Sequence, residues 1–141
     1  MSTPITILII DDDPDFREFA RIVLESREYA VLEAENAEDG LALMHAELPA
    51  IVLLDAMMSY ELAGVGIIRT VREDSKLADI PLILISAVLS QDEDRFLPAD
   101  ERAMVNRFLT KPISPDQLLA EVASTLAKKA SNPVTANEEM T

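Results

Sequence analysis

The sequence predicts an α/β fold in which a doubly wound sheet of five parallel strands lies between two layers of helices. Short apolar runs rich in branched side chains end in polar residues, which is typical of strands buried on both faces. Segments with the spacing of amphipathic helices separate these runs, and parallel neighbours need such crossovers. For five strand–helix units we expect the strand order 2-1-3-4-5, with the first and third strands side by side.

The first half of the chain predicts three strands and two helices. Residues 5–10 form the first strand, and Asp13 and Pro14 then begin a helix as its cap and first residue. One apolar face continues that helix to about Ser26, and it consists of Phe16, Phe19, Ala20, Val23 and Leu24. Residues 29–33 make a second strand, Asn36 caps a helix that ends at Leu48, and residues 51–54 form the third strand.

The second half is less regular. Residues 57–66, with two glycines, predict a loop, and a third helix follows on the apolar face of Ile67, Ile68 and Val71. Strands are expected at 82–85 and 107–110, with a helix of undefined limits within 87–106. Ser114 and Gln117 form a capping box for a last amphipathic helix that reaches residue 126. We therefore expect one domain over 1–128, followed at 129–141 by a disordered polar tail or the start of a linker.

The charge of the chain restricts its partners. A total of 26 acidic against 12 basic residues gives a formal net charge of −14, which repels nucleic acid and anionic membranes. No cysteine is present, so disulfides, thiolate metal sites and cysteine nucleophiles are excluded. The sequence contains no apolar run long enough to span a membrane. These features predict a soluble, cytoplasmic protein that does not bind DNA directly.

Polar residues follow four of the predicted strands, at the edge where ligands bind in open α/β sheets. Asp11 and Asp12 follow the first strand, and Asp55 follows the third, so the three carboxylates should converge. Carboxylates this close repel one another unless a cation lies among them, and a donor set of oxygen atoms favours magnesium. Lys111 and Ser86, at the ends of two further strands, suit phosphate oxygens. Together they are parts that phosphoryl transfer requires, and a carboxylate can itself be the nucleophile.

Four motifs in fixed order resemble the receiver domain of two-component response regulators. They are the acid pair in Ile-Leu-Ile-Ile-Asp-Asp-Asp, the acceptor in Leu-Leu-Asp-Ala-Met-Met, Ser-Ala at 86–87 and Phe-Leu-Thr-Lys-Pro at 108–112. The resemblance covers about residues 5–127 and implies a flavodoxin-like (βα)5 fold of the stand-alone, CheY-like kind. It also implies a signalling domain that catalyses only its own phosphorylation and dephosphorylation and is otherwise not an enzyme.

By this resemblance, Asp55 accepts a phosphoryl group from the phosphohistidine of a sensor kinase or histidine phosphotransfer protein. Asp11, Asp12, Asp55 and the backbone carbonyl of Met57 bind magnesium. Lys111 and Ser86 bind the phosphoryl oxygens.

The same resemblance assigns a switch to Ser86 and Phe108. As Ser86 moves toward the phosphoryl group, Phe108 turns inward and reshapes a face made by the fourth helix, the fifth strand and the fifth helix. That face binds a downstream protein. The residues alone leave open whether Phe108 is this switch or a plain core residue, and whether phosphorylation causes homodimer formation.

Two other functions remain open at this point. Haloacid-dehalogenase-like phosphatases also carry an Asp-x-Asp after their first strand, and Asp11 and Asp13 match it, although Asp15 stands where threonine or valine is usual. The third alternative is an adaptor that keeps the fold and binds a partner regardless of phosphorylation. The sequence names neither the kinase nor the target.

Overall fold

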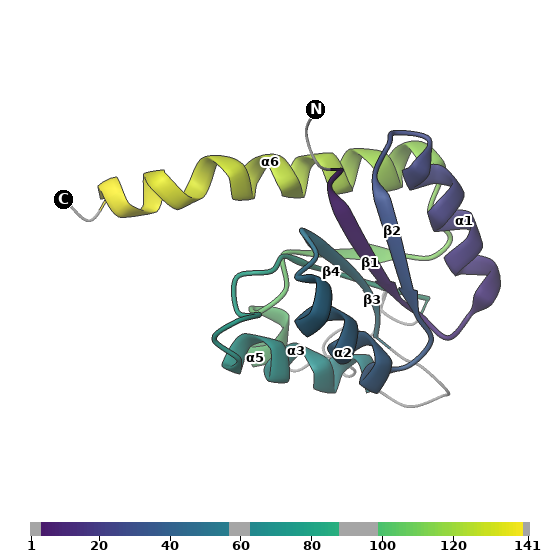
Figure 1. Ribbon diagram of the computed structural model, residues 1–141, viewed down its shortest axis with the longest axis horizontal. Helices are drawn as coiled ribbons and strands as arrows, with labels where there is room; N and C mark the ends of the chain where they lie inside the picture. The colour runs from purple at the N-terminus through teal and green to yellow at the C-terminus, as the bar shows by residue number, and fades with distance from the viewer. Residues whose placement is uncertain (1–3, 57–62, 88–98, 140–141) are drawn as a thin grey trace.

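The sheet has five parallel strands in the order β2-β1-β3-β4-β5 (Figure 1). This computed structural model describes residues 4–56, 63–87 and 99–139. The strands are β1 (Thr6–Ile10), β2 (Ala30–Ala34), β3 (Ile51–Asp55), β4 (Leu82–Ser86) and β5 (Arg107–Thr110). The predicted fold class and strand order are confirmed.

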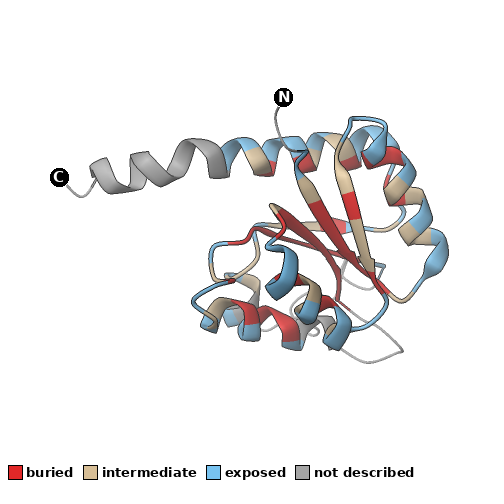
Figure 2. Ribbon diagram, viewed as in Figure 1, coloured by how far each residue is buried: buried red, intermediate tan, exposed pale blue. Residues whose placement is uncertain are grey.

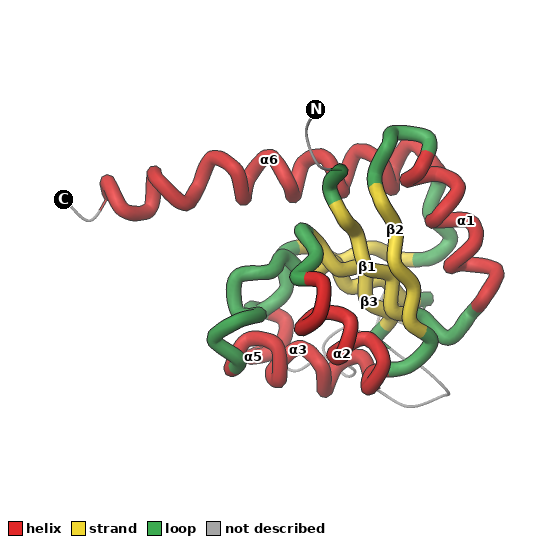
Figure 3. Tube along the Cα trace, viewed as in Figure 1, coloured by secondary structure: helices red, strands yellow, loops and turns green. Residues whose placement is uncertain are grey.

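Helices cover both faces of the sheet (Figure 3). They are α1 (Pro14–Glu25), α2 (Ala37–Glu47), α3 (Ala63–Glu73), the short α5 (Ala99–Arg102) and α6 (Pro115–Glu139). Helices α1 and α6 pack together on one face, while α2, α3 and α5 lie on the other. This places helical crossovers on both sides of the sheet, as a doubly wound fold requires.

Alternate residues of the central strands supply two separate cores, because successive strand side chains point to opposite faces. In β1, Leu8 and Ile10 join the core under α2 and α3, whereas Ile7 and Ile9 join the core under α1 and α6. Both sets are fully buried, and the central strands appear as a continuous buried layer in Figure 2. The unbroken apolar runs of the sequence follow from burial on both faces.

Side-chain caps begin three of the helices at the predicted residues. Asp13 accepts a hydrogen bond from the Asp15 amide at 2.9 Å, and Asn36 accepts one from the Asp39 amide at 2.7 Å. Ser114 Oγ accepts one from the Gln117 amide at 3.1 Å. These bonds satisfy amide groups that have no partner within the first turn of a helix.

Helix α6 differs from the prediction for residues 129–141. The helix continues to Glu139, which differs from the disordered tail that was one predicted alternative, while the other alternative, the start of a linker, stays a prediction. Lysine and alanine, which favour helices, follow Leu126, and extending an anchored helix costs far less than starting one. The correction is that a segment needs no apolar face of its own to continue a helix that is already packed.

Helix α3 begins earlier than expected for the same reason. Residues 63–66 belong to its first turn, although their two glycines predicted a loop. The buried side chains of Ile67 and Ile68 anchor the helix just beyond them. Residues 57–62 lie outside the described residues, as do residues 88–98, which held most of the expected fourth helix.

Arg72, near the end of α3, ties the starts of β4 and β5 together. Its guanidinium donates to the carbonyls of Met104 at 2.8 Å, Ala78 at 2.9 Å and Ile80 at 2.7 Å. It also contacts Asn106 Oδ1 at 3.2 Å, and that oxygen accepts from the Leu82 amide at 2.8 Å. Arg72 therefore fixes the edge of the sheet opposite to the predicted site.

Among the described residues, no helix is long and apolar enough to cross a membrane.

Candidate functional site

The predicted site residues lie at the carboxyl ends of four strands. Asp11 directly follows β1, Asp55 ends β3, Ser86 ends β4 and Lys111 directly follows β5. Ile10 pairs with Leu54 and Ser86 pairs with Thr110, so the strands end at nearly the same level. Parallel pairing therefore gathers residues that are up to 100 positions apart in the chain.

Three carboxylates converge at this edge. One oxygen from each of Asp11, Asp12 and Asp55 lies within 4.8 Å of the others. Asp11 and Asp55 are only 1% and 7% exposed, whereas Asp12 is more open to solvent. Buried carboxylates at this separation need a compensating cation, and an all-oxygen donor set suits Mg²⁺. The residues present therefore fit the magnesium ion that receiver domains generally use.

The ammonium of Lys111 compensates part of this negative charge. Lys111 Nζ donates to Asp11 Oδ2 at 2.8 Å and lies 3.7 Å from Asp55 Oδ2. It also lies 4.4 Å from the centre of the Phe16 ring, a distance suited to a cation–π contact. Burial lowers the pKa of Lys111. The hydrogen bond and charge of Asp11, with the charges of Asp55 and Asp13, raise this pKa by more than burial lowers it, so the net shift is upward. Lys111 therefore carries its charge throughout the physiological range.

Hydrogen bonds also fix the backbone around Asp11. The Asp11 amide donates to the Ala34 carbonyl at 3.0 Å, and Asp11 Oδ1 accepts from the Asp13 amide at 2.9 Å. The Asp11 carbonyl accepts from Arg17 Nη1 at 2.8 Å. Sequence reasoning missed Arg17, because an arginine in a helix with charged neighbours usually indicates a solvated face.

Ser86 and Phe108 occupy different surroundings. Ser86 is 3% exposed, and its carbonyl accepts from the Lys111 amide at 3.4 Å, which joins the ends of β4 and β5. Phe108 is half-buried and packs against the core under α2 and α3. Met57, predicted as a carbonyl ligand, lies outside the described residues.

A hollow of about 560 Å³ lies beside the site. The side chains of Phe16, Phe19 and Lys111 line it, together with Ala87 and Pro112, which flank the site on the chain. The Lys111 side chain therefore borders this hollow as well as the acids.

Comparison with known proteins places these features in a family. Residues 7–123 match the response regulator receiver domain. The chain is 33% identical over 121 residues to PilH of Pseudomonas aeruginosa, and the match covers 86% of this chain and 97% of PilH. It is 39% identical over 113 residues to an uncharacterised 14.6 kDa protein of Leptolyngbya boryana, with 80% and 83% of the two chains covered.

The chain spans about half the length of several other curated relatives. One of these is the phosphate regulon transcriptional regulatory protein PhoB of P. aeruginosa, which is 33% identical over 123 residues. That match covers 87% of this chain and 52% of PhoB. The solved structure of a CheY-like receiver domain from Methanospirillum hungatei JF-1 has the same fold, with a TM-score of 0.80 at 22% identity, over 92% of this chain and 99% of that one. The chain therefore belongs to the response regulator receiver domain family.

Proposed function

We propose that this chain acts as a response regulator receiver in which Asp55 accepts a phosphoryl group from a phosphohistidine. The donor is a sensor histidine kinase or a histidine phosphotransfer protein. The observation that carries the proposal is the position of the Lys111 ammonium, which lies 2.8 Å from Asp11 and 3.7 Å from Asp55. A cation placed between these two carboxylates can also contact a group attached to Asp55.

The step is a displacement at phosphorus. A carboxylate oxygen of Asp55 forms the new P–O bond while the P–N bond to the imidazole breaks, and the leaving nitrogen keeps the electron pair. The transferred group carries charge on its three remaining oxygens, and fixed donors at those oxygens lower the barrier. Lys111 Nζ and Ser86 Oγ are the donors that we assign to this role.

Asp11, Asp12, Asp55 and the Met57 carbonyl are the ligands that we assign to Mg²⁺. When bound, the ion neutralises charge on the carboxylates and on the phosphoryl oxygens. The chain itself contributes the convergent carboxylates, their burial and the ammonium that limits their repulsion.

The readout that we propose is a change in a protein-binding surface. Ser86 and Phe108 are the switch residues, and the surface combines the expected fourth helix, most of which lies outside the described residues, with strand β5 and helix α6. Phe108 is half-buried beside a core, so it has packing partners on one side and solvent on the other. We further propose that residues 1–128 form the receiver domain, that the protein works in the cytoplasm and that its target is another protein, without direct contact to nucleic acid or membrane.

The test is phosphorylation in solution. Incubation of the protein with Mg²⁺ and acetyl phosphate is expected to add one phosphoryl group, measured by intact mass spectrometry. Asp55→Asn should add none, whereas Asp116→Asn, which changes an exposed acid in the first turn of α6, should behave like the wild type. An unchanged wild-type mass would contradict the proposal.

Two further assays separate the other functions. A phosphatase that uses Asp11 would hydrolyse a phosphomonoester and lose that activity in Asp11→Asn but not in Asp55→Asn. An adaptor would bind its partner equally well before and after phosphorylation.

A further inference from the structure

Arg17 connects three elements next to the acidic site. It is the fourth residue of α1, and its Nη1 donates to the Asp11 carbonyl at 2.8 Å. Its Nε donates to Glu33 Oε1 in β2 at 2.9 Å. The Arg17 side chain is 17% exposed, so most of its surface is shielded from water. One planar fork therefore links helix α1, strand β2 and the loop that carries two of the three acids.

The bond to the Asp11 carbonyl acts on both acids of that loop. The carbonyl of Asp11 and the amide of Asp12 belong to one peptide unit, which is planar. A donor that fixes the carbonyl direction also fixes the direction in which the chain enters Asp12. Asp12 is more exposed than Asp11 and Asp55, so its side chain has less packing to hold it in place.

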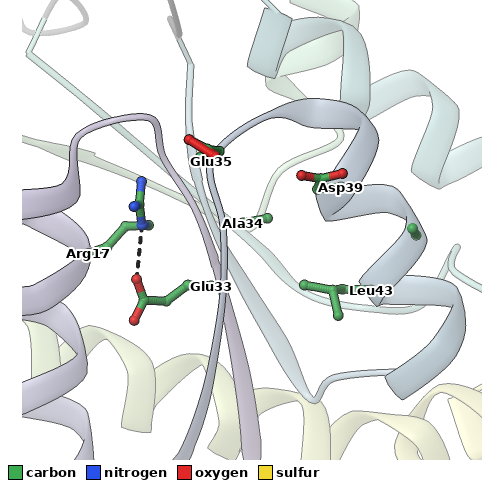
Figure 4. Close-up of a pocket in the computed structure, with 7 residues that line it drawn as sticks. Arg17, Glu33, Ala34, Glu35, Asp39 and Leu43 are labelled. Atoms are coloured by element: carbon green, nitrogen blue, oxygen red, sulfur yellow. Dashed lines mark hydrogen bonds and ion pairs between the residues drawn. The ribbon is translucent and has the colours of Figure 1, made fainter.

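Glu33 fixes the position of the Arg17 side chain. It accepts from Arg17 at Oε1 and from Arg21 at Oε2, so both carboxylate oxygens are engaged. Glu33 pairs in register with Ile9 of β1, next to Ala34, whose carbonyl accepts from the Asp11 amide. Figure 4 shows Arg17 and Glu33 facing each other, with Glu35 and Asp39 lining the same hollow of about 410 Å³.

We infer that Arg17 is a positioning residue for the magnesium site: by holding the Asp11–Asp12 peptide against β2, it sets the separation of the carboxylates of Asp12 and Asp55. The inference rests on the proposed function, because it assigns a role toward the ion that this function requires. Groups that orient metal ligands typically change metal affinity by about 10- to 100-fold when removed.

Two effects of Arg17 on Mg²⁺ affinity have opposite signs. As a nearby cation, Arg17 repels Mg²⁺, so its loss would tighten binding if charge were its only contribution. As an anchor, it pre-arranges the ligands, so its loss would weaken binding. The direction of the change therefore distinguishes the two roles.

The experiment compares Arg17→Gln, Arg17→Lys and Arg21→Gln with the wild type. Arg21 is a matched control because it binds the same Glu33 one turn further along α1, and within the described part of the chain its ion pairs are with Glu33 and Glu25 and not with the acid loop. Magnesium affinity is measured by ¹⁵N–¹H NMR titration at constant ionic strength, on proteins shown to be folded by circular dichroism.

Arg17→Gln is expected to bind Mg²⁺ about tenfold more weakly than the wild type. Arg17→Lys should also bind weakly, because a single ammonium does not reproduce the planar fork that serves two acceptors. Arg21→Gln should remain within about twofold, since its ion pairs are partly exposed and weak. Without Mg²⁺, the amide resonances of Asp12 and Asp13 should shift in Arg17→Gln and stay in place in Arg21→Gln.

Unchanged or tighter Mg²⁺ binding in Arg17→Gln would overturn the inference, as would equal losses in Arg17→Gln and Arg21→Gln. Absence of Mg²⁺ binding by the wild type would overturn it too. The proposed function fails separately: a wild type that binds Mg²⁺ but accepts no phosphoryl group contradicts phosphorylation and leaves the role of Arg17 intact.

Discussion

Lys111 places one positive charge against two buried carboxylates. Its ammonium contacts Asp11 and lies close to Asp55, and both acids are almost fully buried. Such a lysine does two things at once, because it stabilises the fold without a metal ion and it competes with a metal ion for the same oxygens. The stability of the protein and its affinity for Mg²⁺ should therefore respond to Lys111 in opposite directions.

The first prediction concerns Lys111→Met, which keeps an unbranched apolar stem but removes the charge. In the absence of Mg²⁺ the variant should lose about 1–3 kcal/mol of unfolding free energy, because Asp11 and Asp55 lose their compensating cation. Added Mg²⁺ should raise the melting temperature of the variant more than that of the wild type, since the ion meets no competing ammonium. Both quantities are measured by thermal and urea unfolding.

Lys76→Met is the control, because Lys76 is exposed and lies away from the site. It should change neither the stability nor the response to Mg²⁺. Equal stability of Lys111→Met and the wild type without Mg²⁺ would show that Lys111 does not compensate the acids.

The second prediction concerns Glu33 and acid pH. Burial raises the pKa of Glu33. Hydrogen bonds and charges from Arg21 and Arg17 lower this pKa by more than burial raises it, so the folded-state pKa lies below the ordinary 4.5. A carboxylate with a lowered folded-state pKa contributes stability that is present above its unfolded-state pKa and is lost as pH falls through the folded-state pKa. Glu33→Gln should therefore cost about 1 kcal/mol at neutral pH, and this cost should shrink progressively below pH 4.5.

Urea unfolding of both proteins across the acid range measures this difference. Glu35→Gln, at an exposed acid two residues away, should show no such pH dependence. A difference that grows on acidification would contradict the assigned sign of the pKa shift.

At the scale of elements, the packing of α2 on β1 depends on one glycine. Gly40 is buried in α2, and a Cβ atom placed there would lie 2.5 Å from Ile10 Cδ1 and 2.9 Å from Ile10 Cγ1. Ile10 is itself fully buried and cannot turn away freely. Glycine has a low helix propensity, but at position 40 its missing Cβ permits α2 to approach β1 closely.

The third prediction follows from this contact. Alanine in place of glycine in a helix interior ordinarily stabilises by about 0.5–1 kcal/mol, but Gly40→Ala should destabilise by about 1–3 kcal/mol through overpacking. Gly66→Ala is the matched control, because a Cβ atom there meets no atom of the described residues within 4 Å. Denaturant unfolding of the two variants should give changes of opposite sign, and stabilisation by both would contradict the packing argument.

The sequence predicted the elements well where local rules decide them. The caps at Asp13, Asn36 and Ser114 each needed only a suitable side chain before an amphipathic run, and all three are present. The strand order followed from alternating elements, so the convergence of Asp11, Asp12 and Asp55 was also predictable. The caps depend on short-range patterns. The strand order depends on the rule that parallel strands are joined by helical crossovers, and the alternation of strands and helices in the sequence reveals those crossovers.

Other features depend on distances that spacing does not reveal. The hydrogen bond from Arg17 ends on the backbone carbonyl of Asp11, so no complementary side chain in the sequence indicates it. The same holds for Arg72, whose acceptors are mainly carbonyls of the segments that precede β4 and β5. The continuation of α6 was missed because its stability comes from an anchored first part rather than from an apolar pattern of its own.

At the scale of the whole molecule, α6 divides into a packed part and a continuation. The α6 side chains that the structure describes end at Lys128, and among them Leu118, Val122 and Thr125 are buried. Figure 1 shows the rest of the helix extending away from the sheet. The folding unit that we propose therefore ends at residue 128.

The fourth prediction tests this limit by removing residues 129–141. The unfolding free energy should change by less than about 0.5 kcal/mol, as for other changes away from packed surfaces, while helical circular dichroism decreases. Leu118→Ala in the full chain should cost about 2–5 kcal/mol, because it opens a cavity under α6. A truncation that destabilises as much as Leu118→Ala would place the limit of the folding unit beyond residue 128.

The length of α6 also has a mechanical consequence. At 1.5 Å per residue, its 25 residues make a rod of about 37 Å, which starts shortly after Lys111 and buries Leu118, Val122 and Thr125 along its first part. A tilt of about ten degrees at Pro115 would carry the free end through about 6 Å. By this geometry alone, a small change of angle in the loop beside the ammonium would give a much larger displacement at the far end of α6.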